Sequence, residues 1–258
     1  MFKGRRIAVV IPAFNEAAKI ARTVRSVPGF VDHVIVVDDA SQDGTGRIAR
    51  RSQRRGLAVL RHERNRGVGA AIATGYAAAF EAGAEVTAVM AGDSQMDPAD
   101  LSALVEPVVA GRADYAKGNR FAWPGVFHVM PASRMMGNIV LSYLTRVASG
   151  YGQVFDSQCG YTAANRRALS IILSGSVFPR YGYPNDILSR LGSHAARVID
   201  VPVRPVYGPE WHSGIRIPRV VGPLLRLVLR GICVRFLRSL QRRVLRINPV
   251  ALSESPPP

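Results

Sequence analysis

Short runs of consecutive apolar residues alternate with amphipathic segments along the first part of the chain. The apolar runs are continuous, as in strands that are buried on both faces, and they lie at 7–12, 33–38, 57–61 and 86–90. The amphipathic segments have helical spacing and lie at 15–27, 45–55 and 68–82. This alternation predicts an α/β fold: a mostly parallel, Rossmann-like sheet with helices on both faces.

The same alternation continues beyond residue 98. It predicts helices at 99–110, at 133–148, after Asn165 and from Asn185-Asp186, and strands at 115–117 and 197–203. The segment 133–148 is apolar on one face and has arginines near its ends. Its pattern suits a helix that packs on the core as well as one that faces a membrane.

Polar residues follow the fourth apolar run directly, in the sequence Gly92-Asp93-Ser94-Gln95. Asp93 offers a carboxylate and Gln95 an amide carbonyl, and hard divalent cations prefer such oxygen ligands. Open α/β sheets bind ligands at the carboxyl ends of their strands. The sequence therefore indicates a cation and phosphate site here, although a lone Asp at a strand end is also an ordinary turn or cap residue.

Composition narrows the class of protein. The chain has 258 residues, of which 48% are hydrophobic and 20% charged, enough for one globular core. Cys159 and Cys233 match no metal or disulfide spacing, so a reducing, cytosolic environment is expected. The first residues lead straight into a strand and do not have the pattern of a signal peptide.

The formal charge of +16 is concentrated near the end of the chain. No acidic residue lies between Glu210 and Glu254, whereas this stretch has nine arginines among Leu, Val and Ile. The apolar part from Val220 is interrupted by arginines too early to span a bilayer. We therefore expect short amphipathic interfacial helices that bind an anionic leaflet peripherally, or else a partner membrane protein.

These patterns divide the chain into three parts. We expect a folded α/β domain at 1–210, basic amphipathic membrane-associating helices at 211–249 and a disordered tail at 250–258. The expected location is the cytoplasmic face of a membrane. Whether the protein also forms a homo-oligomer stays open.

Three strand ends present motifs in a fixed order: Pro12-Ala-Phe-Asn-Glu16, Asp38-Asp39-Ala-Ser-Gln-Asp-Gly-Thr45 and Asp93-Ser-Gln95. With this set, residues 7–207 resemble inverting nucleotide-sugar glycosyltransferases of the GT-A fold. The resemblance is to the group that makes polyprenyl-phosphate sugars, which includes the dolichyl-phosphate mannose and dolichyl-phosphate glucose synthases. Any one of the motifs alone is weak, but their order is specific.

The resemblance implies roles for residues in the first half of the chain. It implies that Asp39 binds the imide N–H of the base, and that Asp93 and Gln95 hold a divalent metal, Mg²⁺ or Mn²⁺, on the diphosphate. The implied nucleotide pocket comprises Pro12, Phe14, Glu16, Asp38, Asp39, Arg66, Gly67 and Asp93.

The resemblance also implies roles for residues in the second half of the chain, at the acceptor. Gly118-Asn-Arg-Phe121 is similar to the family's Gly-Ser-Arg-Tyr, which implies that Arg120 binds the acceptor phosphate. Arg134 with Asn138 is similar to its second phosphate-binding element, and Asp156-Ser-Gln-Cys-Gly160 to the Asp-Thr-Gln-Cys-Gly of the branch that uses UDP-glucose. Asp186 is interpreted first as a helix cap, and as a general base if the acceptor is a hydroxyl.

Two departures from the family pattern stand out. Ala91 replaces the first acid of the usual Asp-x-Asp, so Gln95 and water would complete the metal site. Members of the family often have a basic residue late in the domain that meets the diphosphate. It has no clear counterpart in this chain, and Arg204 and His212 are candidates. The Gln-x-x-Arg-Trp element of processive polysaccharide synthases is absent, which is evidence against a polymerase.

The sequence thus favours a membrane-associated transferase that moves a sugar from a UDP-hexose or UDP-hexosamine to a polyprenyl phosphate with inversion. Alternatives are the use of GDP-mannose and transfer to a saccharide hydroxyl. A catalytically weakened scaffold is a third alternative, because the first acid is missing. A basic RNA- or membrane-binding protein is the fourth, although the chain has no nucleic-acid module signature and we expect no nucleic-acid partner.

Overall fold

The computed structural model describes residues 1–130, 132–206, 229 and 231–233. In this part of the chain, seven strands form one sheet in the order β3-β2-β1-β4-β6-β5-β7. The strands are β1 (Ile7–Ala13), β2 (His33–Asp38), β3 (Leu57–Arg61), β4 (Val86–Val89), β5 (Tyr115–Asn119), β6 (Thr162–Asn165) and β7 (Val198–Pro202). Every strand that the apolar pattern predicts is present.

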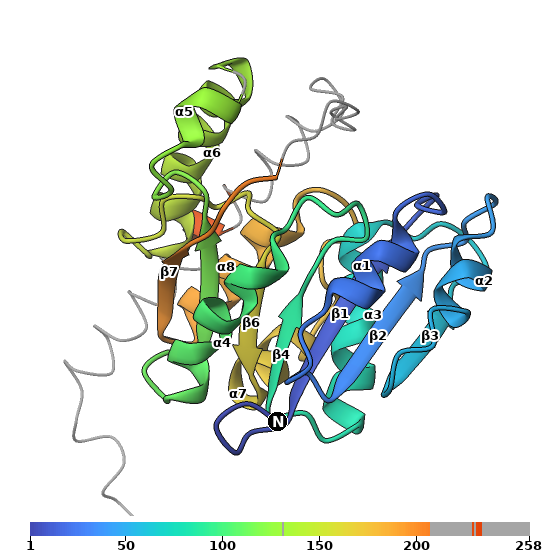
Figure 1. Cartoon of the computed structure of the whole chain (residues 1–258). Helices are drawn as coiled ribbons and strands as arrows, with labels where there is room; N and C mark the ends of the chain where they lie inside the picture. Colours follow the sequence, from blue (N-terminus) through green and yellow to red (C-terminus); the bar gives the residue numbers. More distant parts are fainter. Residues whose placement is uncertain (131, 207–228, 230, 234–258) are drawn as a thin grey trace, which may run out of the picture.

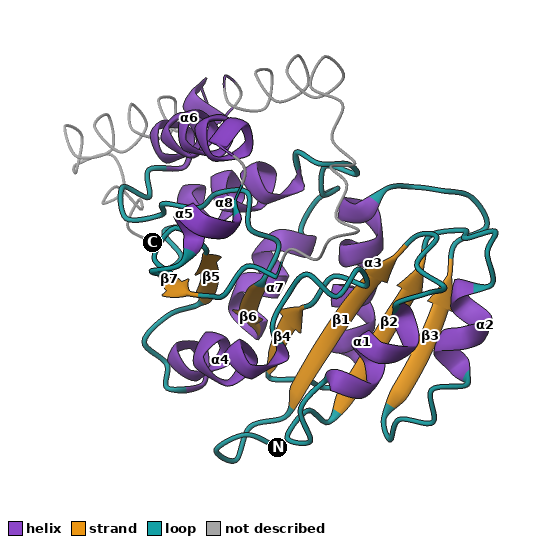
Figure 2. Ribbon diagram, turned by 45° about the horizontal axis from the view of Figure 1, so that its top comes forward, coloured by secondary structure: helices purple, strands orange, loops and turns teal. Residues whose placement is uncertain are grey.

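Helices cover both faces of the sheet (Figures 1 and 2). On one face, Ile7, Val9 and Ile11 of β1 pack with residues of α1 (Ile20–Ser26), α2 (Thr45–Arg50) and α4 (Leu101–Val109). On the other, Ala8 and Val10 pack with residues of α3 (Val68–Glu81), α7 (Arg166–Leu173) and α8 (Tyr183–Ser193). Successive residues of β1 thus enter opposite cores, which explains why its sequence is apolar without a break.

Two helices are shorter than their sequence pattern predicts. The helix expected from Asn15 begins only at Ile20, because Asn15 has a left-handed φ of 55° in the turn after β1. The helix expected to reach residue 55 ends at Arg50, and Gln53 beyond it has a φ of 47°. In both places, residues whose spacing predicts a helix lie in a polar turn instead.

Strand β6 is the element that the sequence analysis misses. It consists of Thr162-Ala-Ala-Asn165 and pairs antiparallel with both β4 and β5, whereas the other strand pairs are parallel. Four residues with small side chains lack the β-branched, apolar run that marks a strand. Because β6 runs the opposite way, its first residues lie at the edge where β4 and β5 end.

Two helices extend the molecule beyond this edge. The short α5 (Val126–Val129) and α6 (Ala132–Ser149) follow β5 and project at the upper left of Figure 1. Helix α6 packs against α8. Among the described residues, no helix is both long and apolar enough to cross a bilayer.

Candidate active site

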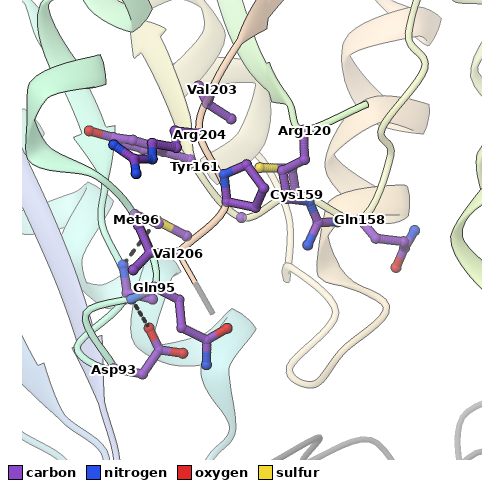
Figure 3. A pocket seen from close by; sticks show the side chains of 13 residues that line it. Asp93, Gln95, Met96, Arg120, Gln158, Cys159, Tyr161, Val203, Arg204 and Val206 are labelled. Atoms are coloured by element: carbon purple, nitrogen blue, oxygen red, sulfur yellow. Dashed lines mark hydrogen bonds between the residues drawn. The ribbon is translucent and has the colours of Figure 1, made fainter. Parts of the chain in front are cut away.

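A cavity of about 150 Å³ lies where β4, β5 and β7 end and β6 begins. Asp93 and Gln95 lie on one side of it, and Arg120 and Gln158 approach it from another (Figure 3). The segment after β7 closes a third side, where the Val206 N–H donates to the carbonyl of Gln95 over 3.2 Å. The described lining consists of Ala91, Asp93, Gln95, Met96, Arg120, Gln158, Cys159, Gly160, Tyr161, Val203, Arg204, Pro205 and Val206.

The tight turn after β4 presents Asp93. The Gln95 N–H donates to Asp93 Oδ1 over 3.0 Å, and Ser94 between them has a φ of 60°. The Ser94 hydroxyl is 2.8 Å from the hydroxyl of Thr23, whose Oγ1 also donates to the carbonyl of Gly92. Helix α1 therefore fixes the turn, and the two predicted metal ligands line the same cavity.

Glu16 adds a second carboxylate near Asp93. Burial raises the pKa of Glu16, and the negative charge of Asp93 raises it further. Two carboxylates that repel each other at a polar strand edge are a donor set that suits a hard divalent cation. The described residues contain no group of three or more His, Cys, Asp or Glu that could hold a metal by themselves. A metal at this place would therefore need further oxygen ligands, and that Asp93 and Gln95 hold one stays a prediction.

The loop after β1 is tied to the loop after β2. The Asn15 N–H donates to Ser41 Oγ over 3.0 Å, and the Glu16 N–H donates to Thr45 Oγ1 over 2.8 Å. Pro12 is buried in β1, while the Phe14 ring is 46% exposed. An exposed aromatic ring on a loop held in this way can stack on a base or ribose, which is the role predicted for Phe14.

Two aspartates, Asp38 at the end of β2 and Asp39 directly after it, hold neighbouring loops. Asp39 accepts hydrogen bonds from the N–H groups of Arg66 (2.8 Å) and Gly67 (2.7 Å), and His62 Nδ1 lies 2.7 Å from its Oδ1. Asp38 is fully buried and accepts from the Ser41 N–H and from Arg61. In this structure the two carboxylates position the loops after β2 and β3, and direct contact of either with a nucleotide stays a prediction.

Gly67 lets this loop approach another segment closely. Its φ is 93°, and a Cβ there would lie 2.4 Å from the carbonyl oxygen of Pro179. The Gly69 N–H donates to the same carbonyl over 2.8 Å. The exposed Arg66 side chain is thus carried on a loop that is anchored on both sides.

Arg120 is held by the most extensively bonded charge pair of the site. Its Nε and Nη2 donate to the two oxygens of Asp156 over 2.6 and 2.8 Å, and its backbone N–H donates to Oδ2 over 3.1 Å. Burial alone would raise the pKa of Asp156, but the charge of Arg120 and its hydrogen bonds lower it below its ordinary value. A charged guanidinium that is fixed at the cavity wall can position an anionic group.

Two further predicted acceptor residues lie on α6. Arg134 is in its first turn, but the Arg134 side chain is outside the described residues. Asn138 is partly buried, and within the described part of the chain its Nδ2 is a buried donor with no partner. A buried donor without a partner is uncommon in folded proteins, and the role of Asn138 at the acceptor stays a prediction.

Asp186 is not the helix cap that the sequence suggested. The cap of α8 is Gly182, and Asp186 lies inside the first turn. Its carboxylate accepts from the Phe178 N–H over 2.9 Å and from Arg190 over 3.2 Å. Asp186 also lies outside the described lining of the cavity, and its role as a general base stays a prediction.

Sequence reasoning missed several residues of the site. Tyr161 lines the cavity, and Lys117 on β5 is almost fully buried beside it, donating to the carbonyl of Cys159. Gln158 also lines the cavity, and it belongs to the motif 156–160, for which the resemblance implied no separate role of this side chain. Arg204, one of two candidates for the late basic residue, also lines the cavity, whereas His212 lies outside the described residues. The antiparallel course of β6 brings 158–161 to this edge, so the resemblance marks the motif 156–160 but no pattern along the chain places it beside Asp93.

Comparison with known proteins assigns the fold and the group. The model of the family described as "Glycosyl transferase family 2" matches residues 8–172. The chain is 29% identical over 216 residues to the UDP-N-acetylglucosamine–dolichyl-phosphate N-acetylglucosaminyltransferase of Methanococcus voltae, covering 78% of this chain and 86% of that protein. It is 30% identical over 205 residues to the polyprenol monophosphomannose synthase of Mycolicibacterium smegmatis, covering 77% of each.

A solved structure of a glycosyltransferase supports the assignment of the fold. Glucosyl-3-phosphoglycerate synthase of Mycobacterium tuberculosis, in complex with Mn²⁺, UDP and glucosyl-3-phosphoglycerate, matches with a TM-score of 0.64 and 25% identity. The match covers 90% of this chain and 80% of that one. The predicted GT-A fold and the resemblance to polyprenyl-phosphate sugar synthases are thereby confirmed, while the predicted interfacial helices at 211–249 lie almost entirely outside the described residues.

Proposed function

Because the chain belongs to glycosyl transferase family 2, we propose that it moves a sugar from a nucleotide-sugar to a polyprenyl phosphate with inversion of the anomeric carbon. We favour UDP-N-acetylhexosamine and UDP-hexose as donors. The relative from M. voltae, named for a UDP-sugar and a dolichyl phosphate, supports this choice. The relative from M. smegmatis, named for mannose, keeps GDP-mannose as the second candidate.

The charge of the cavity wall supports a phosphate acceptor. Among the described lining residues, Arg120 and Arg204 are cationic and Asp93 is the single carboxylate. A hydroxyl acceptor would need a second carboxylate as general base. A phosphate monoester is anionic at neutral pH, so cations that position it for in-line attack are sufficient. This is the observation that carries the proposal.

Each group in the cavity then has one task. Asp93 and Gln95, with Glu16 beside them, would hold Mg²⁺ or Mn²⁺, which neutralises the charge that develops on the leaving nucleoside diphosphate. The loop of Asp39, Arg66 and Gly67 seats the nucleotide. Arg120, fixed by Asp156, holds the acceptor oxygen in line with the bond that breaks.

A panel of nucleotide-sugars tests the reaction. Radiolabelled UDP-GlcNAc, UDP-glucose and GDP-mannose are each incubated with the full chain, Mn²⁺ and either polyprenyl phosphate or an oligosaccharide. We expect label in the organic phase with a UDP-sugar and polyprenyl phosphate, and an anomeric configuration opposite to that of the donor. Label that appears only on the oligosaccharide would reject the phosphate acceptor.

Helix α6 supports peripheral membrane binding, because its amphipathic pattern is reversed. Its inward residues Ser142, Thr145 and Ser149 are buried and polar: Ser142 bonds Ser157, and Thr145 bonds Asn185. Its outward residues are large and apolar, with exposed fractions of 45–65%, namely Met136, Ile139, Val140, Tyr143 and Val147. A helix that packs by polar residues and exposes apolar ones is typical of a surface that meets lipid.

The tail and α6 together suit an anionic leaflet on the cytoplasmic side. Gly231 lies against α6 and α8, since a Cβ there would be 3.1 Å from Ala148 Cβ and 2.3 Å from Ser189 Oγ. The nine arginines of 216–246 belong to the same stretch of chain. Basic residues near an anionic surface contribute about 1 kcal/mol each, so this stretch and α6 would bind it jointly.

Vesicle flotation tests this surface. The full chain is expected to float with vesicles that contain anionic lipid, and weakly with purely zwitterionic ones. Val140→Asp/Tyr143→Asp should weaken flotation, whereas Ser170→Asp on the exposed side of α7 should not. If the α6 variant floats like the wild type but loses a co-purifying membrane protein, α6 binds that protein instead.

A further inference from the structure

One buried cluster beneath the cavity has no part in the proposed chemistry. It lies between β5 and β7, where Lys117 is paired in register with Asp200. Lys117 donates to the carbonyl of Cys159, and burial lowers its pKa. Asp200 is partly buried, and within the described part of the chain its Oδ1 is a buried atom without a hydrogen-bond partner.

The other oxygen of Asp200 joins two segments of the acceptor site. Oδ2 accepts from Asn119 Nδ2 over 2.9 Å and from the Phe155 N–H over 2.7 Å. Asn119 directly precedes Arg120, and Phe155 directly precedes Asp156. A single carboxylate oxygen therefore holds the residue before each member of the charge pair.

The side chain of Asn119 also stabilises the turn after β5. Its Oδ1 accepts from the N–H groups of Phe121 (3.0 Å) and Ala122 (3.2 Å), the two residues after Arg120. Arg120 is thus held by Asn119 before it, by the capped turn after it and by Asp156 across from it. These contacts reach the cavity wall without a direct contact between Asp200 and a substrate.

We propose that Asp200 is a positioning residue of the acceptor site, whose carboxylate ties Asn119 and Phe155 together and so keeps Arg120 and Asp156 in their paired geometry. This inference rests on the proposed function for its meaning in catalysis. An ionised carboxylate makes stronger hydrogen bonds to N–H donors than a neutral acid or amide does. The charge of Asp200 therefore sets how firmly the two segments are held.

The titration of Asp200 agrees with such a role. Burial and the negative charge of Asp156 raise the pKa of Asp200 to about 6, against the lowering effects of the Phe155 N–H, Lys117 and Asn119. Among the described residues, Arg120 lies beside Lys117 and pairs with Asp156, and Arg146 of α6 lies 4.7 Å from the centre of the Phe155 ring. The carboxylate is ionised at neutral pH and takes up a proton near pH 6.

Ionisation of Asp200 is expected to strengthen the positioning of Arg120 but to lower the stability of the fold. The folded-state pKa is above the ordinary value of 3.8, so the contribution of Asp200 to stability is full below that value and is lost as the pH rises through about 6. At neutral pH the ionised group weakens the fold. Asp200→Asn should therefore not lower the Tm at pH 7.5, which separates a positioning role from a structural one.

Asp114 provides a matched control at the opposite ends of the same two strands. Its carboxylate accepts from the Arg197 N–H just before β7 and from Asn165, and it pairs with Arg167. It is buried, whereas Asp200 is partly buried, and it links the start of β5 to the start of β7, at the end of these strands away from the cavity. Asp114→Asn should affect stability without affecting the acceptor site.

Hydrogen exchange with mass spectrometry tests the restraint without any substrate. At pH 7.5, Asp200→Asn should speed the exchange of peptides covering 119–122 and 155–156 by about 10-fold, the effect of weakened charge-assisted hydrogen bonds. Asp114→Asn should leave these peptides unchanged. Exchange in the Asp200→Asn protein equal to that of the wild type would overturn the proposal.

Kinetics provide the second readout. At pH 7.5, Asp200→Asn should raise the KM for polyprenyl phosphate roughly 10-fold with the KM for the nucleotide-sugar unchanged, because misplacement of a positioning group costs such factors. The ratio of wild-type to variant kcat/KM should fall to about 1 at pH 5, where both side chains are neutral. The titration of the acceptor cancels in this ratio because both enzymes use the same acceptor.

The outcomes separate the two proposals. A wild-type enzyme that does not use polyprenyl phosphate refutes the proposed function, while the exchange rates still decide the role of Asp200. A ratio of kcat/KM that does not change between pH 5 and pH 7.5 refutes the role of Asp200 alone.

Discussion

The two halves of the sheet build their sides of the cavity differently. In the nucleotide half, β1–β4 with α1–α3, parallel strands end in loops that bond to one another through backbone N–H groups, as at Asp39. In the acceptor half, β5–β7 with α6 and α8, an antiparallel strand brings in a buried ion pair, Arg120 with Asp156. The first half depends on local motifs and the second on contacts between distant segments.

This difference predicts whether a substitution in each half should affect activity alone or stability as well. A change of Asp93 or Glu16 in the nucleotide half should remove chemistry and leave the fold intact, because these two carboxylates are partly exposed. A change in the acceptor half should affect the fold as well, because the charges there are buried and mutually dependent.

The largest expected effect is that of Asp93→Asn. Loss of a metal-ligand carboxylate should lower kcat by roughly 10³-fold, since the metal contributes several kcal/mol to the transition state. The Tm should stay within about 2 °C of the wild type, as for a partly exposed surface substitution. Glu106→Gln, a carboxylate of α4 that pairs with Lys3, is the control. Normal turnover of Asp93→Asn would show that the cavity is not the metal site.

Arg120→Met should damage both fold and activity. It leaves the fully buried Asp156 without its charge partner, which costs about 3–5 kcal/mol of unfolding free energy. The double variant Arg120→Met/Asp156→Leu should recover most of that stability and none of the transfer. Chemical denaturation with a transfer assay measures both, and full activity in the double variant would remove Arg120 from the acceptor site.

Gly69→Ala should disturb the contact between the halves. Its Cβ would lie 2.1 Å from the carbonyl oxygen of Phe178 and 2.8 Å from Tyr183 Cβ, so the backbone must shift. We expect a loss of about 1–3 kcal/mol, as for overpacking, together with weaker nucleotide binding by calorimetry. Gly29→Ala, which has open space around its Cβ, should do neither. Equal effects of the two substitutions would argue against this packing.

Asp114→Asn should have the smallest effect, and a defined pH dependence. Burial would raise the pKa of Asp114, but the Arg197 N–H, Arg197 and Asn165 lower it to about 2. A lowered pKa stabilises the fold above the ordinary value and ceases to do so as the pH falls through about 2. The variant should lose about 1–2 kcal/mol at pH 7 and progressively less from pH 4 downwards, by thermal unfolding. A penalty that persists at pH 2 would contradict this assignment.

The sequence predicts the nucleotide half better than the acceptor half for a physical reason. Asp93, Gln95 and Glu16 stand next to apolar strands, so a pattern read along the chain places them at one edge. Gln158 and Tyr161 reach that edge only through β6, whose small residues carry no strand signal. Asp200 was not recognised at all, because its importance lies in two contacts with residues 81 and 45 positions away.

The sequence also left the character of α6 undecided. Its apolar positions fit a helix turned towards the core, and only the buried Ser142, Thr145 and Ser149 show that the polar face is the inner one. Periodicity reports that a helix has two faces, but it does not report which face is covered.

The outward apolar face of α6 has a practical consequence for handling this enzyme. In detergent-free buffer, Met136, Ile139, Val140 and Tyr143 would be wetted, and molecules at high concentration would bury them against one another. Elution volumes from gel filtration in such a buffer would report non-specific association rather than the native oligomeric state. Mild surfactant or nanodiscs are accordingly the conditions under which its particle size has meaning.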